Sequence, residues 1–475
     1  MFQKRPTLHT KPFPTDWRDY QGSLIHTGNQ KQLIFKRIKY AIIMTVLGML
    51  LYFGVTGLGD QADGRNCPED QQSATALQIS RIQEETNAIS KAEIRTSIDS
   101  GRVLNLTTQT LNFYHAGKKF NATTSIDFNL QAYMLSQMNW RSPRYIPRYL
   151  GIVVMDPTTG RVLSMTGFDR DNKTDNPCIM GKFPAASIFK IITAAAAVET
   201  CDLKPDSKLT FNGGKYTLYK SQIKEKTNKY TNRILFKDAF AQSVNPVFGK
   251  IGALRLGKDT LEKYALAFGF NRDIGFEIPV APSRVRLSEK PYQWAEIACG
   301  FNRDTTLSPL HGAMLASAVA NHGILIEPSI FDRVSDDRGK TVYVNHPAII
   351  HQAITPQTSE TVMDLMQATI KSGTCRKAFR GRKKDAILKR LTIGGKTGSI
   401  YNRQRDARFD WFVGFAADKQ SDAQIAIAVV VGHGKYIGTR ASHYARLAMK
   451  EYFGSYFSKS NNTIGSKAQP IKAKG

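Results

Sequence analysis

Apolar residues follow one another in several continuous runs, and these runs predict the main elements of the chain. Tyr149–Phe168 holds two apolar segments around the turn sequence Asp156-Pro-Thr-Thr-Gly160, which predicts a β-hairpin. Phe183–Thr200 is apolar on nearly every side and predicts a buried helix. The other predicted elements are a short strand leading into a helix at Ala122–Met138, helices at Phe236–Leu256, Leu307–Gly323 and Ser442–Phe453, and strands at Leu391–Ser399, Asp410–Ala416 and Ala423–Val431. Helices grouped between hairpin-joined strands predict an α+β fold with a central antiparallel sheet flanked by helices.

One apolar run has the length of a membrane span. Tyr40–Leu58 carries no charged side chain and is long enough to cross the hydrocarbon layer as a helix. Met1–Lys39 contains eight Lys or Arg and two Asp, so the N-terminus is expected in the cytoplasm and the rest of the chain outside. A cleaved signal peptide is the alternative, but the run is long for a signal core and lacks a clear small-residue cleavage site.

The membrane segment divides the chain into regions of different character. Residues 1–39 form a basic cytoplasmic segment and residues 40–58 the transmembrane helix. The polar residues 59–121 are expected to form a juxtamembrane stalk or small cap with one helix. Residues 122–455 are the large extracellular domain, and residues 456–475 are a basic tail expected to be disordered.

The chain is strongly basic, and its expected location limits what this charge can bind. It has 66 Lys and Arg against 39 Asp and Glu, a net charge of +27. Nucleic acid is not a partner outside the cell, so the plausible acidic partners are phospholipid head groups and a carboxylate-bearing wall polymer. The densest basic run is Arg376–Arg390, for which a solvated loop or helix face is the plainer interpretation.

Cysteine and metal-ligand patterns predict little chemistry. Five cysteines lie beyond the expected span, so at least one has no partner within the chain. Cys178 and Cys201 flank one predicted helix and form the pair most compatible with a disulfide. No CxxC is present, so neither a structural zinc site nor any other metal is predicted, and no cofactor is implied.

Three short motifs carry the candidate chemistry. In Ser187-Ile-Phe-Lys190, the spacing places a hydroxyl and an amine on one face of a helix. Burial would lower the pKa of the lysine, and the neutral amine could then activate the serine as a nucleophile. Ser221-Gln-Ile-Lys224 has the same spacing but stands in a polar stretch, so it is interpreted as chance.

The other two motifs are weaker when each is taken alone. Ser243-Val-Asn245 precedes Pro246 and could present a hydroxyl and an amide from a turn, although Ser and Asn also favour helix caps. Gly394-Gly-Lys-Thr-Gly-Ser399 lacks the spacing of a phosphate-binding loop and follows an apolar strand. As an edge strand it would offer Lys396, Thr397 and the Ser399 N–H to a ligand carboxylate and carbonyl.

Together and in this order, the three motifs resemble the SxxK, SxN and KTG set of penicillin-binding proteins and serine β-lactamases. Their separations, 243 − 187 = 56 and 396 − 243 = 153 residues, are similar to those of the transpeptidase domain of larger penicillin-binding proteins. Segments such as TSIDFNLQ, GIVVMDPTTGRVLSM and DWFVGFAAD extend the resemblance over about residues 122–455. The resemblance implies a β-lactamase/transpeptidase-like fold and serine acyl transfer.

The resemblance also implies a role for each motif residue in acyl transfer. Ser187 attacks the penultimate D-alanine carbonyl of a peptidoglycan stem peptide, and Lys190 is the general base. Ser243 relays the proton to the leaving amine, together with Lys190 and Lys396.

Substrate binding is implied for the remaining motif residues. Asn245 orients the substrate amide, Thr397 and Lys396 hold the terminal carboxylate, and Gly398 belongs to the same binding strand. The backbone N–H groups of Ser187 and Ser399 form the oxyanion hole.

The implied partners are stem peptides ending in D-Ala-D-Ala, β-lactam antibiotics, the bacterial plasma membrane, and a glycosyltransferase or other wall-synthesis proteins. The expected function is a single-pass, membrane-anchored D,D-transpeptidase whose catalytic domain lies on the periplasmic side. Three alternatives stay open: a D,D-carboxypeptidase, a β-lactamase, and a non-catalytic β-lactam-binding scaffold. The first uses water as the acceptor, and the second needs a group that activates the deacylating water, which the sequence does not identify.

Overall fold

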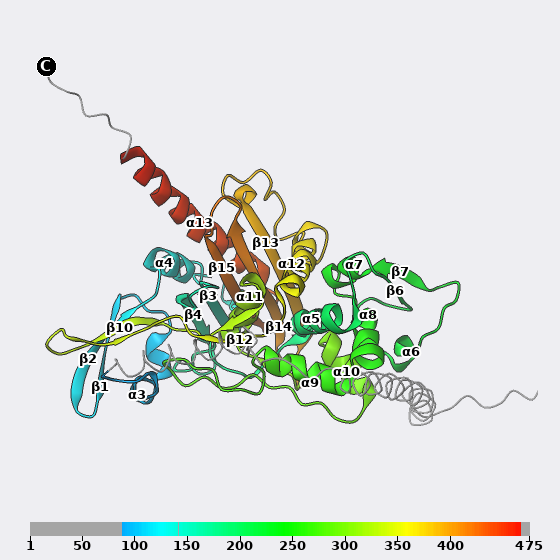
Figure 1. Ribbon diagram of the computed structural model, residues 1–475, viewed down its shortest axis with the longest axis horizontal. Coiled ribbons are helices and arrows are strands. Elements are labelled where there is room, and N and C mark those ends of the chain that lie inside the picture. Colours follow the sequence, from blue (N-terminus) through cyan, green and yellow to red (C-terminus); the bar gives the residue numbers. More distant parts are fainter. Residues whose placement is uncertain (1–87, 141, 467–475) are drawn as a thin grey trace, which may run out of the picture. The chain divides into compact units, whose positions relative to one another are not determined.

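A five-stranded antiparallel sheet forms the centre of the computed structural model, which describes residues 88–140 and 142–466 (Figure 1). Its strands, in sheet order, are β13 (Leu391–Tyr401), β14 (Arg408–Asp418), β15 (Gln424–His433), β3 (Tyr149–Met155) and β4 (Val162–Asp169). The predicted hairpin and the three predicted C-terminal strands are therefore confirmed and belong to one sheet. β13 lies at an edge, so one side of its backbone has no neighbouring strand in this sheet.

Both faces of this sheet are buried, which explains why its strands are apolar without interruption. Successive side chains of a strand point to opposite faces, and in β3 Ile152 and Val154 join one hydrophobic core whereas Val153 and Met155 join the other. Helices cover the two faces: α11 (Pro309–Ala320) lies against one, and α4 (Phe128–Ser136) and α13 (Ala441–Ser466) lie against the other. The predicted α+β fold with a helix-flanked antiparallel sheet is thus confirmed.

A group of helices packs beside β13; in Figure 1 its members are drawn in green, except α12, which is yellow. Its central member is α5 (Lys190–Cys201), which is preceded by a 3₁₀ turn at Ala186–Phe189 and is buried over most of its length, as predicted. The surrounding helices are α6 (Lys220–Ile223), α7 (Phe236–Ala241), α8 (Asn245–Lys250), α9 (Gly257–Ala267), α10 (Pro291–Cys299) and α12 (Pro356–Lys371), with a π-helical turn at Ile251–Leu256.

The helix predicted without interruption over Phe236–Leu256 is broken in the structure. Chain direction changes at Ser243, whose φ of +58° lies in the left-handed region, and α8 starts again at Asn245. Pro246 contributes to the break because it has no N–H to donate to the carbonyl of Gln242 four residues earlier, whereas a proline is well accommodated in the first turn of a new helix.

A smaller four-stranded sheet joins the N-terminal part of the described chain to a later hairpin. Its order is β1 (Thr110–His115), β2 (Lys118–Thr124), β10 (Phe331–Asp336) and β11 (Thr341–Val344), and α3 (Lys91–Ser97) packs on β1. The expected boundary between residues 121 and 122 falls inside β2. Pairing with a distant hairpin could not be seen from the local pattern. The remaining pairs are β5 (Phe183–Pro184) with β8 (Thr306–Leu307), β6 (Lys208–Phe211) with β7 (Asn232–Leu235), and β9 (Ile324–Ile326) with β12 (Ile349–Gln352).

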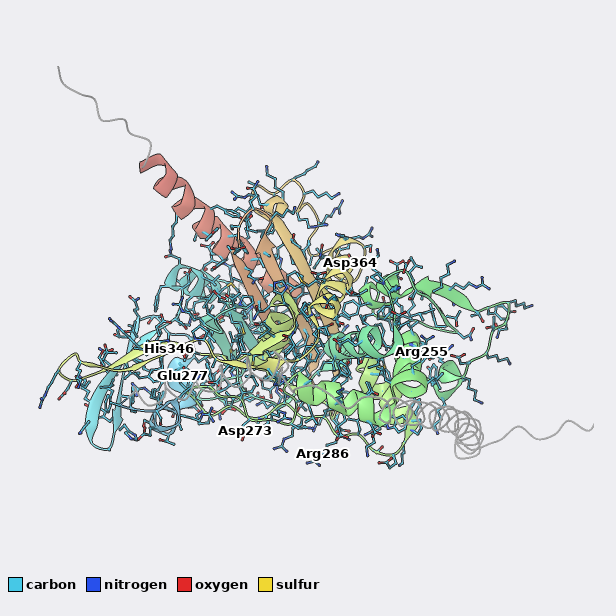
Figure 2. All side chains as sticks on the ribbon, in the orientation of Figure 1. Arg255, Asp273, Glu277, Arg286, His346 and Asp364 are labelled. Atoms are coloured by element: carbon cyan, nitrogen blue, oxygen red, sulfur yellow. The ribbon has the colours of Figure 1, made fainter. Side chains whose placement is uncertain are left out.

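A buried carboxylate ties this smaller sheet to the body of the protein. Glu277, labelled near the small sheet in Figure 2, is fully buried and accepts hydrogen bonds from Ser329 Oγ and from the N–H of Ile330. Lys91 of α3 approaches the same carboxylate at 3.7 Å. Removing any one partner would leave Glu277 buried without its full set of contacts, which costs free energy. These contacts therefore fix the position of the segment before β10.

Two further expectations are corrected by the structure. Cys178 and Cys201 are both free cysteines; Cys178 is buried beside the carbonyls of Ile152 and Thr166, so flanking the same helix did not bring the pair together as a disulfide. The tail expected from residue 456 is helical as far as Ser466 as part of α13, and Phe457 near its start is buried.

The expected membrane span Tyr40–Leu58 lies outside the described residues, as do residues 59–87 of the expected stalk. Among the residues that the structure does describe, no helix is both long enough and apolar enough to cross a membrane.

Candidate active site

The turn before α5 brings Ser187 and Lys190 into contact. Ser187 lies in the 3₁₀ turn and is half-buried, and Lys190 is the first residue of α5 and fully buried. Lys190 Nζ lies 2.8 Å from Ser187 Oγ. Ala186, the residue before the serine, has a φ of +49°, a left-handed conformation that is uncommon for a residue with a side chain. The predicted serine–lysine pair is therefore assembled at a tight turn.

The other contacts of Lys190 decide what its amine can do. Nζ also lies 2.8 Å from Asn245 Oδ1 and 2.5 Å from the carbonyl oxygen of Cys299, and both atoms can only accept hydrogen bonds. The amide orientation of Asn245 is supported by its Nδ2, which donates to the carbonyl of Tyr216 at 3.0 Å. A neutral amine has two N–H donors and one lone pair. When the donors satisfy Asn245 and Cys299, the lone pair faces Ser187 Oγ.

Burial favours that neutral form. Removal of Lys190 from water lowers its pKa from 10.5 to about 8, although the Coulombic interaction with Cys299 acts in the opposite direction. Among the described residues, no carboxylate contributes to the pKa of Lys190. The amine is thus prepared to accept a proton near neutral pH.

A second lysine and serine face this pair from other elements. Lys396 of β13 is fully buried, and its Nζ donates to Ser243 Oγ and to the Thr397 carbonyl, both at 2.9 Å. Burial, and then the nearby positive charge of Lys190, hold the pKa of Lys396 well below its usual value. Ser243, in the break between α7 and α8, and Asn245, the first residue of α8, are each 7% exposed. Residues of all three predicted motifs therefore meet at one site.

The strand β13 passes close to the backbone of the serine turn. A Cβ atom placed on Gly398 would lie 3.2 Å from the nitrogen of Ser187 and 3.1 Å from the Cβ of Ala186. Gly300, which follows α10, is more tightly confined, because a Cβ there would lie 1.9 Å from the Ala186 carbonyl oxygen. Both glycines are needed so that β13 and the end of α10 can approach the nucleophile turn.

Three side chains outside the motifs support Thr397 and Ser399. Thr374, which follows α12, has its hydroxyl 2.5 Å from that of Thr397. Asp410 of β14 accepts a hydrogen bond from Ser399 Oγ at 3.1 Å and pairs with Arg440 through both carboxylate oxygens. Asp410 is buried; burial alone would raise the pKa of its carboxyl, but the neighbouring His433 side chain, the charge of Arg440 and the Ala441 N–H outweigh this and hold the pKa low.

Sequence reasoning did not identify these supporting groups or the Cys299 carbonyl. They act through backbone atoms or lie far from the motifs in sequence, so local spacing carries no signal for them. The competing Ser221–Lys224 copy is kept apart from the cleft on α6, where Ser221 is exposed. No group of three or more His, Cys, Asp or Glu side chains within residues 88–140 and 142–466 is arranged to hold a metal ion.

Comparison with known families and sequences points in one direction. The family model for the penicillin binding protein transpeptidase domain matches residues 150–452. Peptidoglycan D,D-transpeptidase PbpA of Mycolicibacterium smegmatis is 26% identical over 326 residues, covering 60% of this chain and 62% of that protein. Stage V sporulation protein D of Bacillus subtilis is 24% identical, covering 64% of this chain and 49% of that protein. The chain thus matches less than two thirds of the length of these two relatives.

Solved structures show the same fold at low sequence identity. The crystal structure of PBPA from Mycobacterium tuberculosis has a TM-score of 0.57 and 21% identity, covering 70% of this chain and 81% of that one. The imipenem acyl-enzyme complex of penicillin-binding protein A from the same organism has a TM-score of 0.57 and 22% identity, covering 70% and 79%.

Proposed function

Because this chain belongs to the penicillin-binding protein transpeptidase family, we propose that it is a serine D,D-transpeptidase that cross-links peptidoglycan stem peptides and is acylated by β-lactams. The observation that carries the proposal is the environment of Lys190. Its buried amine has two acceptors for its N–H groups, and the lone pair of the neutral amine would then face Ser187 Oγ, which lies 2.8 Å from Nζ. This is the arrangement of a serine nucleophile with its base.

In the first half-reaction, Ser187 Oγ attacks the carbonyl carbon of the penultimate D-alanine while its proton passes to Lys190 Nζ. The developing oxyanion accepts hydrogen bonds from the backbone N–H groups of Ser187 and Ser399. The C–N bond to the terminal D-alanine then breaks, and Ser243 donates a proton to the leaving amine. A serine ester of the shortened stem peptide and free D-alanine are the products.

Substrate binding would use the strand side of the cleft. Thr397 and Lys396 would hold the terminal carboxylate, and this negative charge would raise the pKa of Lys396 again by compensating its burial. Asn245 would orient the substrate amide, and Gly398 would allow the peptide to approach β13. In the second half-reaction, an amine of a neighbouring stem peptide attacks the ester, a peptide bond forms, and the proton returns to Ser187.

The proposed location is the outer side of a bacterial plasma membrane. A single span at Tyr40–Leu58 with the basic residues 1–39 in the cytoplasm would hold residues 59–475 on the substrate side. A glycosyltransferase or another wall-synthesis protein is the partner that this position suggests, since a transpeptidase acts on newly made glycan strands. A reporter enzyme active only outside the membrane should function when it is fused after Gly475 and fail when it is fused before Met1.

A fluorescent penicillin tests the nucleophile. One label should attach covalently to the full chain, and mass spectrometry should locate it on Ser187. Ser187→Ala should abolish labelling, whereas Ser221→Ala, the matched change in the sequence copy on α6, should leave it intact. Labelling that survives Ser187→Ala would overturn the proposed chemistry.

A further inference from the structure

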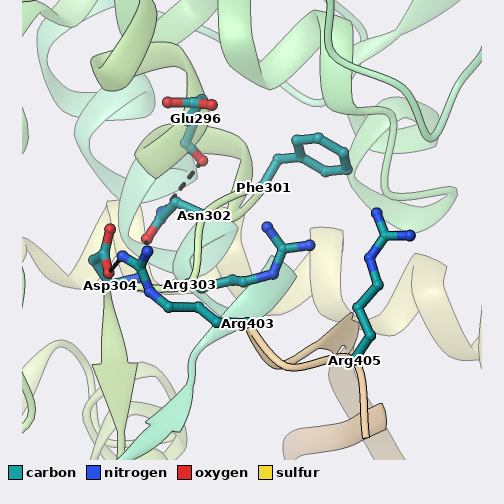
Figure 3. Close-up of a pocket in the computed structure, with 7 residues that line it drawn as sticks. All are labelled: Glu296, Phe301, Asn302, Arg303, Asp304, Arg403 and Arg405. Atoms are coloured by element: carbon teal, nitrogen blue, oxygen red, sulfur yellow. Dashed lines mark hydrogen bonds and ion pairs between the residues drawn. The ribbon is translucent and has the colours of Figure 1, made fainter. Parts of the chain in front are cut away.

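A hollow lined by arginines lies next to the proposed acylation site. It has a volume of about 420 Å³ and is formed where the loop after α10 meets the turn between β13 and β14 (Figure 3). Its lining residues are Glu296, Phe301, Asn302, Arg303, Asp304, Arg403 and Arg405. A second hollow of about 250 Å³ shares Arg303 and Arg403 with it and continues toward Lys182. None of the predicted site residues lines either hollow, so their chemistry is not explained by the acyl-transfer cleft.

The charges in the larger hollow leave two guanidinium groups available to a ligand. Arg403 forms an ion pair with Asp304 across the two loops. Arg303 uses only its Nε, which donates to the Tyr401 carbonyl at 2.9 Å. Arg405 has no side-chain hydrogen bond or ion pair to any described residue. Figure 3 shows the guanidinium groups of Arg303 and Arg405 turned toward the same space. The ring of Phe301 lies on the side of this space away from the turn between β13 and β14.

The remaining acidic lining residue does not neutralise these two groups. Glu296 is half-buried, and this burial, followed by the negative charge of Asp304, raises the pKa of its carboxyl. Figure 3 shows the Glu296 carboxylate pointing away from Arg303 and Arg405. The hollow therefore presents two positively charged, planar guanidinium groups with free N–H donors. Such a pair suits a ligand carboxylate.

The position of the hollow along β13 determines which part of a substrate would reach it. If the terminal carboxylate binds at Thr397 and the reacting carbonyl binds at Ser399, the peptide runs from its C-terminus toward its N-terminus in the direction of Tyr401. Tyr401 is two residues beyond Ser399, a distance of about 7 Å in a strand. Its carbonyl is held by Arg303. Residues upstream of the acylated D-alanine are thus led to the hollow, one or two residues away from the reaction.

We propose that Arg303 and Arg405 bind a free carboxylate on the donor stem-peptide residue that precedes D-Ala-D-Ala. This inference rests on the proposed function, because it uses the direction in which that substrate would lie. Phe301, whose side chain is 44% exposed at the rim, would cover the aliphatic part of the same residue. The site selects the donor before acylation, and it does so without contacting the reacting atoms.

Two synthetic donors test the inference with the full chain. Both end in D-Ala-D-Ala, and the preceding residue carries a side-chain carboxylate in one and the corresponding carboxamide in the other. Release of D-alanine is measured for each, with the same acceptor amine present throughout. The reported value is the ratio of kcat/KM for the two donors within each variant, so a general loss of activity or of folded protein cancels.

The wild-type protein should prefer the carboxylate donor by about tenfold or more, which is typical of a charge-assisted hydrogen bond. Arg303→Gln and Arg405→Gln should each move the ratio toward one, and the loss should appear mainly in KM. Arg338→Gln, on the exposed turn between β10 and β11, is the matched control and should keep the wild-type ratio. Inorganic phosphate at high concentration should compete with the carboxylate donor more strongly than with the carboxamide donor.

The possible failures are distinguishable. Equal kcat/KM for the two donors in the wild-type protein, or an unchanged ratio in both arginine variants, would overturn the carboxylate site while leaving the transpeptidase proposal intact. A wild-type chain that releases D-alanine from neither donor and takes up no penicillin label would overturn both.

Discussion

The pKa of Lys190 can be turned into a prediction about the rate of acylation. With a pKa of about 8, roughly one tenth of the amine is neutral at pH 7. A lysine with the ordinary pKa of 10.5 would be neutral in about one molecule in 3,000 at this pH. Burial therefore increases the population of the competent base by a factor of about 300, since only the neutral amine can take the Ser187 proton.

The sign of the shift fixes the pH dependence. Because the pKa is lowered, the rate should rise about tenfold per pH unit at acidic pH and become level above about pH 8. The assay is the second-order rate constant for covalent labelling by a fluorescent penicillin between about pH 5.5 and pH 9.5, corrected for spontaneous hydrolysis of the antibiotic.

A substitution of the base separates this explanation from a general effect of pH on the fold. Lys190→Arg keeps a cation of similar length, but a guanidinium does not lose its proton in this range, so labelling should fall by about 10²–10⁴. Lys224→Arg, in the copy on α6, should behave as the wild-type protein. A labelling rate that is flat with pH, a midpoint near 10, or near-normal labelling of Lys190→Arg would refute the assignment of Lys190 as the base.

Three other outcomes follow from the site. Gly398→Ala should slow acylation by at least about tenfold, because the new Cβ meets the nitrogen of Ser187 at 3.2 Å; near-normal penicillin labelling would contradict this crowding. Asp410→Asn should lower the free energy of unfolding in urea by about 2–4 kcal/mol, while the exposed control Asp337→Asn changes it little. Because the pKa of Asp410 is lowered in the folded state, its contribution to stability should be present above its ordinary pKa of 3.8 and disappear as the pH falls through the folded-state value. Equal urea stability of Asp410→Asn and wild-type protein near neutral pH would disprove this contribution. The penicillin adduct on Ser187 should persist for minutes or longer, about 10²–10⁴ times the lifetime in an enzyme that activates water, and rapid turnover of a chromogenic cephalosporin would instead indicate a β-lactamase.

The parts of the fold that the sequence predicted are those with a local physical signal. The hairpin of β3 and β4 has two apolar runs and a turn sequence, and α5 is apolar on all sides because it is buried on all sides. The central sheet is covered on both faces, so its strands lack the alternation of a half-exposed sheet and were recognised by their length and their turns. The order of the strands within the sheet carried no local signal.

The parts that could not be predicted depend on distant contacts. The pairing of β2 with β10 joins segments far apart in the chain, and no feature of residues 118–124 distinguishes such a strand from one in a stalk. The proposed disulfide between Cys178 and Cys201 was wrong because helical flanking does not fix the direction of either side chain. In the site, the motif residues were found through their side-chain types, whereas the Cys299 carbonyl was missed because every residue has one.

The large separation in sequence between the paired strands β3 and β15 has a consequence for the newly made protein. Ala426 pairs with Met155, so the middle of the sheet joins positions separated by 426 − 155 = 271 residues. Loop closure over such a distance is entropically costly and delays folding until both partners are available. Lys396 reaches Ser243 only from the strand that this pairing holds in place. A chain whose synthesis has not yet reached β15 therefore has Ser187 without its complete surroundings, so the site of the newly made protein is assembled only after its last strand is present.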